Sequence, residues 1–188
     1  MRRKNMFDEL LVRHCSPTLA GMKTGSIFTC SYTDTAEMRK DIRCFNRMLG
    51  KKGLRILPLR YQNNRALIYV YRPSKLSCAL RHDTACLLLE KCGYCSEIPE
   101  RCVVHLIKRL NEGGEFPHEI GLFLGYPPED VRGFIENRAG NCKCVGCWKV
   151  YGDETEAQKV FAQYKKCTTL YCTQLANGTS IERLTVAG

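Results

Sequence analysis

The chain has 188 residues, 44% of them hydrophobic and 26% charged, and a formal net charge of +10. These proportions are those of a globular protein and exclude a disordered chain, a collagen-like repeat and a coiled coil. No stretch approaches the roughly 18 uncharged apolar residues that a membrane span needs, and the N-terminus lacks the pattern of a signal peptide. We therefore expect a folded protein of one domain in the cytoplasm.

The positive charge is distributed unevenly along the chain. Residues 1–60 hold 13 Lys and Arg against 5 Asp and Glu, whereas residues 61–140 hold 10 of each kind. A basic surface concentrates anions around it. The distribution predicts that the N-terminal third binds an anionic ligand or partner, nucleic acid among them, and a solvated face without a partner is the alternative. The sequence leaves the oligomeric state open.

In the first third of the chain we expect three helices. Residues 7–13 form the first, and Ser16 with Pro17 have the types of an N-cap and a first helical residue, which predicts a second helix toward Phe28. Asp34 and Glu37 fit a capping box for a third helix that ends at Gly50. Its apolar stripe is Met38, Ile42, Phe45 and Leu49, and a second face carries Arg39, Arg43 and Arg47.

The middle of the chain predicts a hairpin and then helices. Two β-rich runs, 54–59 and 66–71, flank an asparagine-containing turn at 62–65, which favours an antiparallel hairpin. A helix is expected over 74–92 and a further one over 99–111, and the run 116–126 fits a helix or a strand equally well.

The last third alternates helices and strands. A helix is expected over 128–137 and a strand over 148–151. Asp153 and Glu156 predict the start of a long helix that Gly178 ends, and 180–186 has the composition of a closing strand. The whole pattern predicts an α+β fold, a single domain whose small mixed or antiparallel sheet is packed with several helices.

A candidate catalytic pair is Cys15 with His118. A thiol just before a helix start has a lowered pKa, and His14 and Lys23 lie close in sequence as ligand-binding residues that assist it. His118 is the candidate general base, with Glu119 or Asn141 to orient it. A cysteine followed by a histidine in this order resembles papain-like cysteine hydrolases, and this resemblance implies a thiol enzyme. The alternative is a core thiol and an ordinary helix residue.

The chain contains 13 cysteines, an odd number, and is longer than a secreted disulfide scaffold. Most are expected to be small buried hydrophobic residues. Two pairs have the spacing of metal-binding or redox thiols, Cys92 with Cys95 and Cys144 with Cys147, and Cys142 adds a third thiol to the second pair. These predict a metal site for zinc or an iron–sulfur cluster, or a redox sensor. Gly93 places Cys92 at the negative end of a helix, which argues against redox catalysis there.

Three segments carry a resemblance over nearly the whole chain. They are residues 14–23 (HCSPTLAGMK), 116–127 (FPHEIGLFLGYP) and 148–153 (WKVYGD). Together they are similar to a bacterial family catalogued as domain of unknown function 3793. The resemblance implies a cytosolic bacterial protein of one domain, and it implies no activity and no catalytic residues.

Overall fold

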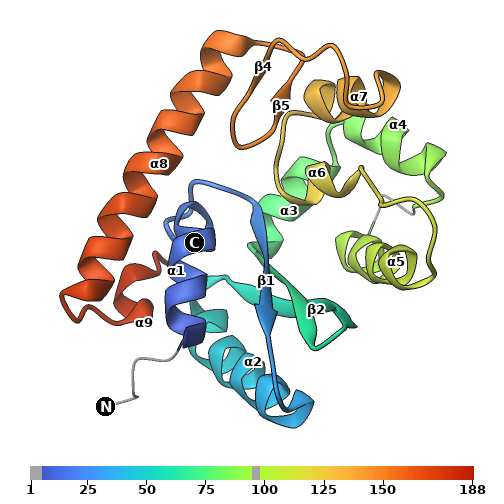
Figure 1. Ribbon diagram of the computed structural model, residues 1–188. Helices are drawn as coiled ribbons and strands as arrows, with labels where there is room; N and C mark the ends of the chain where they lie inside the picture. Colours follow the sequence, from blue (N-terminus) through green and yellow to red (C-terminus); the bar gives the residue numbers. More distant parts are fainter. Residues whose placement is uncertain (1–5, 95–97) are drawn as a thin grey trace. The chain divides into compact units, whose positions relative to one another are not determined.

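The computed structural model describes residues 6–94 and 98–188 (Figure 1). It divides the chain into two compact units, the first made of Met1–Pro73 with Tyr164–Gly188 and the second of Ser74–Gln163. Helices and two small antiparallel sheets make up these units, which confirms the α+β prediction. The count of one domain stays a prediction, and each unit is described by itself.

The first unit begins with α1 (Met6–Leu19), which runs without interruption through Ser16 and Pro17. The prediction of a second helix starting at Ser16 is therefore wrong. The Ser16 hydroxyl donates to the carbonyl of Val12 one turn back, so it lies inside the helix instead of capping one. Pro17 lies in the last turn, where its missing N–H removes one helical hydrogen bond, and Gly21 follows with a left-handed φ of 75°.

A three-stranded antiparallel sheet forms the middle of this unit, with β1 (Gly25–Ser31), β3 (Arg65–Tyr71) and β2 (Arg55–Gln62) in that spatial order. The predicted hairpin is confirmed. Asn63 and Asn64 have φ of 50° and 57°, the left-handed pair that a tight hairpin turn requires. Strand β1 was not predicted, because the helix expected from Ser16 covered its first residues.

Strand β2 lies at an edge of the sheet and is irregular. Pro58 pairs with Ile68 and Arg60 with Leu67, so Leu59 is an extra residue that forms a bulge. Proline has no N–H to donate and is confined to such edge positions.

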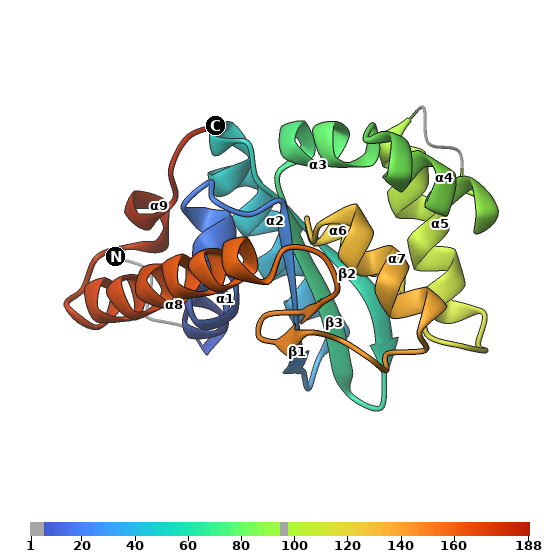
Figure 2. The same cartoon turned by 90° about the horizontal axis from the view of Figure 1, so that it is seen from above.

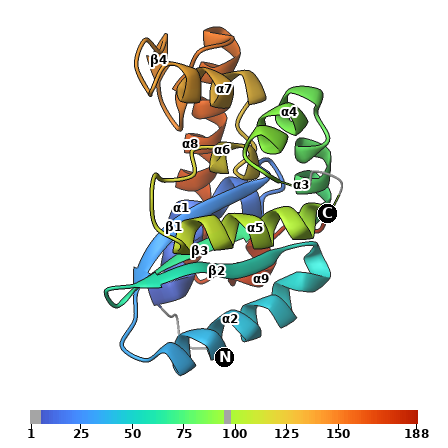
Figure 3. The same cartoon turned by 90° about the vertical axis from the view of Figure 1, so that its right-hand side faces the viewer.

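Helix α2 (Thr35–Leu49) follows the prediction closely. The side chain of Asp34 accepts from the backbone N–H of Ala36 at 2.8 Å and caps the helix. The predicted apolar stripe is buried, and the helix lies along one face of the sheet (Figure 3). A single 3₁₀ turn, η1 (Gly50–Lys52), connects it to β2.

The core of the first unit also uses the end of the chain. Leu175 from α8 (Glu154–Ala176) and Ile181 and Leu184 from α9 (Ile181–Leu184) pack with the inward residues of α1, α2 and the sheet. The closing strand predicted over 180–186 is therefore wrong. Ser180 accepts from the N–H of Arg183 and begins a short helix there.

Arg72 fastens these parts together. Its side chain is 1% exposed and donates to the carbonyls of Thr18 (2.7 Å), Leu19 (2.8 Å) and Val186 (2.7 Å). The first two are among the last carbonyls of α1, where the helix dipole is negative and a cation is favourable. The guanidinium thus caps α1 and holds the C-terminal segment against it.

The second unit is mainly helical. It consists of α3 (Pro73–Leu80), α4 (Asp83–Lys91), α5 (Pro99–Asn111), α6 (Ile120–Phe123), α7 (Pro128–Glu136), the strands β4 (Cys144–Val145) and β5 (Lys149–Val150), and the first part of α8. The single helix expected over 74–92 is two helices, because His82 has extended backbone and begins α4. Helix α7 contacts α4 and α6 (Figure 2), and it also contacts β5.

A buried carboxylate holds the loop that carries β4 and β5. Asp130, 3% exposed, accepts from the indole N–H of Trp148 (2.6 Å) and from the backbone N–H groups of Tyr151 and Gly152 (2.7 Å each). Three donors satisfy the carboxylate and remove the cost of burying it.

Along 6–94 and 98–188, no helix combines the length and the apolar character that crossing a membrane requires.

Candidate functional site

Cys15 does not lie at a helix start. It lies within α1 and its side chain is fully buried in the core of the first unit. Burial raises the pKa of the thiol well above its usual range, although Lys23 and a hydrogen bond with Ser26 act in the opposite direction. The premise of an acidified Cys15 is therefore wrong, because the helix dipole expected to stabilise its thiolate starts nine residues earlier, at Met6.

His14 and Lys23 also belong to the first unit. The His14 ring stacks on Phe28 with centroids 5.7 Å apart, and burial, followed by Arg13, lowers its pKa. His118 and Glu119 belong to the second unit. Their combination with Cys15 in a catalytic site stays a prediction.

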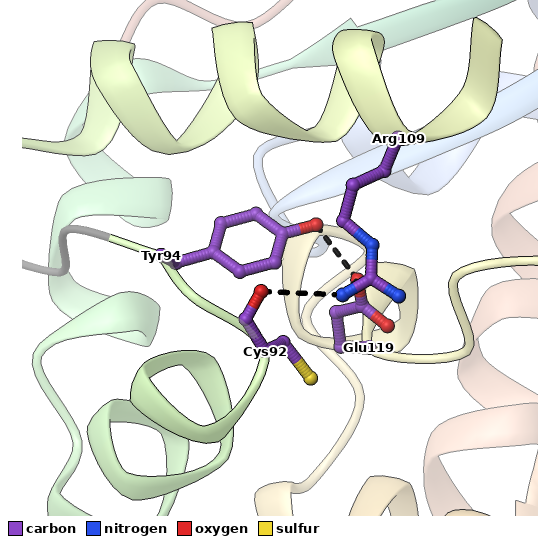
Figure 4. A network of polar contacts seen from close by, with 4 residues as sticks. All are labelled: Cys92, Tyr94, Arg109 and Glu119. Atoms are coloured by element: carbon purple, nitrogen blue, oxygen red, sulfur yellow. Dashed lines mark hydrogen bonds and ion pairs between the residues drawn. The ribbon is translucent and has the colours of Figure 1, made fainter. Parts of the chain in front are cut away.

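A network of polar side chains lies in the second unit around Glu119 (Figure 4). Glu119 directly precedes α6 and is 3% exposed. Its Oε1 accepts from the Tyr94 hydroxyl at 2.8 Å and forms an ion pair with Nη1 of Arg109 at 3.1 Å. Nη1 of Arg109 also donates to the carbonyl of Cys92 at 3.3 Å. The network joins the end of α4, the last turns of α5 and the start of α6.

The network alters the acidity of its members. Burial and then the Glu119 carboxylate raise the pKa of Tyr94, so its hydroxyl stays protonated and remains a donor. Burial opposes the charge on Arg109, but Glu119 raises the pKa of the guanidinium. This arrangement gives a fixed ion pair supported by a neutral phenol.

Cys92 is the C-cap of α4, as the position of Gly93 predicted. Burial and then Glu119 raise the pKa of its thiol, while Arg109 lowers it. A protonated thiol is a weak nucleophile and a weak metal ligand. Cys95, its predicted partner, lies outside the described residues.

A pocket of about 540 Å³ opens beside the network, entirely within the second unit. Its polar lining includes Cys92, Arg109, His118, Glu119 and Arg138. The structure thus brings three of the predicted site residues, Cys92, His118 and Glu119, into one pocket. The sequence had assigned them to two different kinds of site.

Of the loop cysteines, Cys144 lies in β4, Cys142 precedes this strand, and Cys147 lies between β4 and β5. Burial and the Glu154 carboxylate raise the pKa of Cys144. The neighbouring side chains of Lys143 and Lys149 donate to the carbonyls of Gly152 and Ala139. Within the part of the chain that the structure describes, no three His, Cys, Asp or Glu side chains form a group suited to a metal ion. A zinc or iron–sulfur site there stays a prediction.

Charge separates sharply between the two units. The first unit holds 18 Lys and Arg against 6 Asp and Glu, a formal charge of +12, and the second holds 11 against 13, a charge of −2. On the outer face of α2, Arg39, Arg43 and Arg47 are all exposed. The stripe predicted from four-residue spacing is thus an exposed arginine row.

The first unit also contains a pocket of about 290 Å³ between α1, β1 and α2. Three carboxylate residues line it, Asp34, Glu37 and Asp41. Its lining therefore does not suit an anion, whereas the outer face of α2 carries three exposed arginines.

Comparison with known proteins gives one match. Residues 11–185, nearly the whole chain, fit the model of the family described as protein of unknown function DUF3793. The chain belongs to the DUF3793 family. No curated protein matches it, and no solved structure does. Membership in DUF3793 confirms the resemblance of the three sequence segments, two of which, 116–127 and 148–153, lie beside the pocket and in the β4–β5 loop.

Sequence reasoning missed Tyr94, Arg109 and Arg138. Arg109 lies on the predicted helix 99–111 and has the pattern of a solvent-facing charge, and Tyr94 follows a predicted helix stop. Nothing in the local pattern distinguishes these residues from surface residues, since the contacts of Tyr94 and Arg109 with Glu119 join separate segments and Arg138 reaches the pocket only through the fold.

Proposed function

We propose that this protein is a binding protein for the phosphate backbone of a nucleic acid, which it contacts through the arginine row of α2, Arg39, Arg43 and Arg47. The supporting observation is the formal charge of the first unit, which is +12, whereas that of the second unit is −2. A field of that size attracts a polyanion from a distance and is screened by salt.

The row is free to bind. Among the described residues, Arg43 and Arg47 have no ion-pair partner, and both side chains are exposed. Residues four apart on a helix lie about 6 Å from each other along its axis, so the guanidinium groups follow one line. Each guanidinium offers the planar fork of donors that fits a phosphate.

Two features favour nucleic acid over a lipid surface. The apolar stripe of α2 is buried in the core, so the helix has no apolar face to insert among lipids. Arg39 lies 5.9 Å from the ring centre of Tyr61, which itself packs edge-on against Tyr32 at 5.4 Å. Partly exposed aromatic rings beside cations are typical of surfaces that bind single strands.

The test is the salt dependence of binding to a labelled single-stranded oligonucleotide, followed by fluorescence anisotropy between about 50 and 200 mM salt. The double variant Arg43→Gln with Arg47→Gln is expected to reduce the slope of log K against log salt by about 1.4. Lys165→Gln with Lys166→Gln is the matched control, since both lysines are exposed on α8 in the same unit.

The control pair removes the same charge and is expected to change the slope much less. Equal effects of the two double variants would show that only net charge acts. Absence of salt-dependent binding, or tighter binding to vesicles of anionic lipid than to the oligonucleotide, would also overturn the proposal.

A further inference from the structure

The pocket of the second unit has the properties of a small-molecule site. Its volume of about 540 Å³ lies within the range of roughly 300 to 1,000 Å³ that is usual for ligand pockets. It lies in the unit that does not carry the basic surplus, and its lining does not include any residue of the α2 row proposed to bind nucleic acid.

The carboxylate in the wall of the pocket is already neutralised. Glu119 accepts from Tyr94 and pairs with Arg109, as described above. The second acidic residue of the lining, Glu115, is 88% exposed, and its Oε1 lies 3.7 Å from Nε2 of His118. A cationic ligand would therefore compete with Arg109 and Tyr94 for Glu119, and the other carboxylate belongs to a side chain that lies mostly in solvent.

Cationic groups, in contrast, remain available. Arg138 lines the pocket, and among the described residues its guanidinium has no bonded partner. Both bonds of Arg109 use Nη1, so Nε and Nη2 are not needed for either of them. Five N–H donors in a rigid fork make each of these side chains a good receptor for a carboxylate or phosphate.

The remaining wall is apolar and aromatic. Phe116, Phe134, Ile135 and Ala139 line the pocket, and the His118 ring packs against Phe134 with centroids 5.0 Å apart. Apolar walls with a few converging polar groups are typical of sites that bury an organic ligand and fix its orientation.

We infer that this pocket binds a small organic anion, a molecule with an apolar or aromatic body and one carboxylate or phosphate group. Arg138 and Arg109 receive the anionic group, and Phe134 and Phe116 pack against the body. Glu119 and Tyr94 act as positioning residues, because they hold the guanidinium of Arg109 in one orientation.

The experiment uses four probes on the full chain: benzoate, phenyl phosphate, acetate and benzylamine. Chemical shifts of the amides around the pocket are followed during titration. Benzoate or phenyl phosphate is expected to bind with a Kd of about 1 mM, usual for so small a ligand, and the tighter of the two identifies the anionic group. Acetate, which lacks the body, and benzylamine, which has the opposite charge, are expected to bind at least about tenfold more weakly.

The variant Arg138→Met is expected to weaken binding of the preferred probe by about tenfold or more. Arg132→Met is its matched control, because Arg132 is exposed on α7 and does not line the pocket. Alkylation of Cys92, which lines the pocket, is expected to slow when the probe is bound, whereas alkylation of the exposed Cys78 on α3 is not.

Benzylamine binding as tightly as benzoate, equal affinities of the two arginine variants, or unchanged alkylation of Cys92 would each overturn the inference. Failure of every probe to bind would overturn it as well. None of these results depends on the nucleic-acid titration, whose variants lie on α2.

Discussion

The two units handle charge in opposite ways. Among the described residues of the first unit, most charged side chains are exposed or partly exposed, and the buried Arg72 is bound by backbone carbonyls. In the second unit two carboxylates, Glu119 and Asp130, are buried and each is held by specific donors. The difference indicates that the first unit has a charged surface, whereas the second unit contains buried carboxylates that hydrogen bonds hold in fixed positions.

The largest effect on the free energy of unfolding is expected at Arg72, the buried arginine of the first unit. Arg72→Met should lower the free energy of unfolding by about 3 kcal/mol, because four carbonyls, those of Thr18, Leu19, Val186 and Lys52, each lose a donor. Denaturant titration measures it. Arg65→Met, at the exposed start of β3, the strand that ends just before Arg72, should change stability by less than about 0.5 kcal/mol. A loss below about 1 kcal/mol for Arg72→Met would show that the carbonyls find other donors.

The second-largest effect on stability is expected at Asp130, the buried carboxylate that holds the β4–β5 loop of the second unit. Asp130→Asn keeps the shape but turns one acceptor into a donor, so one of the three N–H groups loses its partner. We expect a loss of about 2 kcal/mol and a shift in emission from Trp148, the only tryptophan. Asp153→Asn is the control, since Asn is an equally good helix cap. Equal losses in the two variants would contradict the assignment.

A smaller effect is expected at the hydroxyl that supports Glu119. Tyr94→Phe should lower the free energy of unfolding by about 1 kcal/mol at pH 7, since Glu119 keeps its ion pair with Arg109. The cost arises from one lost hydrogen bond to a buried carboxylate. No measurable loss at neutral pH would mean that water replaces the hydroxyl.

The same variant should also change the alkaline behaviour. The pKa of Tyr94 is raised in the folded protein, first by burial and then by Glu119. Its stabilising contribution is therefore complete below the unfolded pKa of about 10 and is lost as pH rises above it, because only the unfolded tyrosine releases its proton. The free energy of unfolding should fall less steeply with pH in Tyr94→Phe than in the unmodified protein. The difference between the two slopes should be about 1.4 kcal/mol per pH unit near pH 11. Parallel curves for both proteins would contradict the raised pKa.

The smallest effect on stability is expected on α2. Arg43→Gln and Arg47→Gln should each change the free energy of unfolding by less than about 0.5 kcal/mol, because both side chains are exposed and neither has an ion-pair partner among the described residues. Thermal unfolding measures this. A loss of more than about 1 kcal/mol in the free energy of unfolding would show that the arginine row stabilises the fold of the first unit.

The sequence predicted elements whose local signals agree with their packing. Helix α2 has a cap at Asp34 and a regular apolar stripe, and the hairpin has two asparagines that accept left-handed φ. It failed where one residue pattern suits two positions. Ser16 and Pro17 have the residue types of a helix start but lie in the last turn of α1, and the β-branched residues near Ile181 hide a short helix whose place is set by the core.

The candidate site was predicted only in part for a similar reason. His118 and Glu119 are neighbours along the chain and were recognised together as chemically active types. Their partners Tyr94 and Arg109 come from other segments and are joined to them only by the fold. The basic face was predictable from composition, since counting charges requires no knowledge of contacts.

The discontinuous core of the first unit has a consequence for the order of events during synthesis. Residues 1–73 leave the ribosome first, but Leu175, Ile181 and Leu184, which complete their core, leave it last. The second unit is continuous in sequence and is therefore the first that can be completed. Until Leu175, Ile181 and Leu184 have left the ribosome, part of the apolar side of the sheet in the first unit stays uncovered. We expect chaperones to bind the nascent chain there.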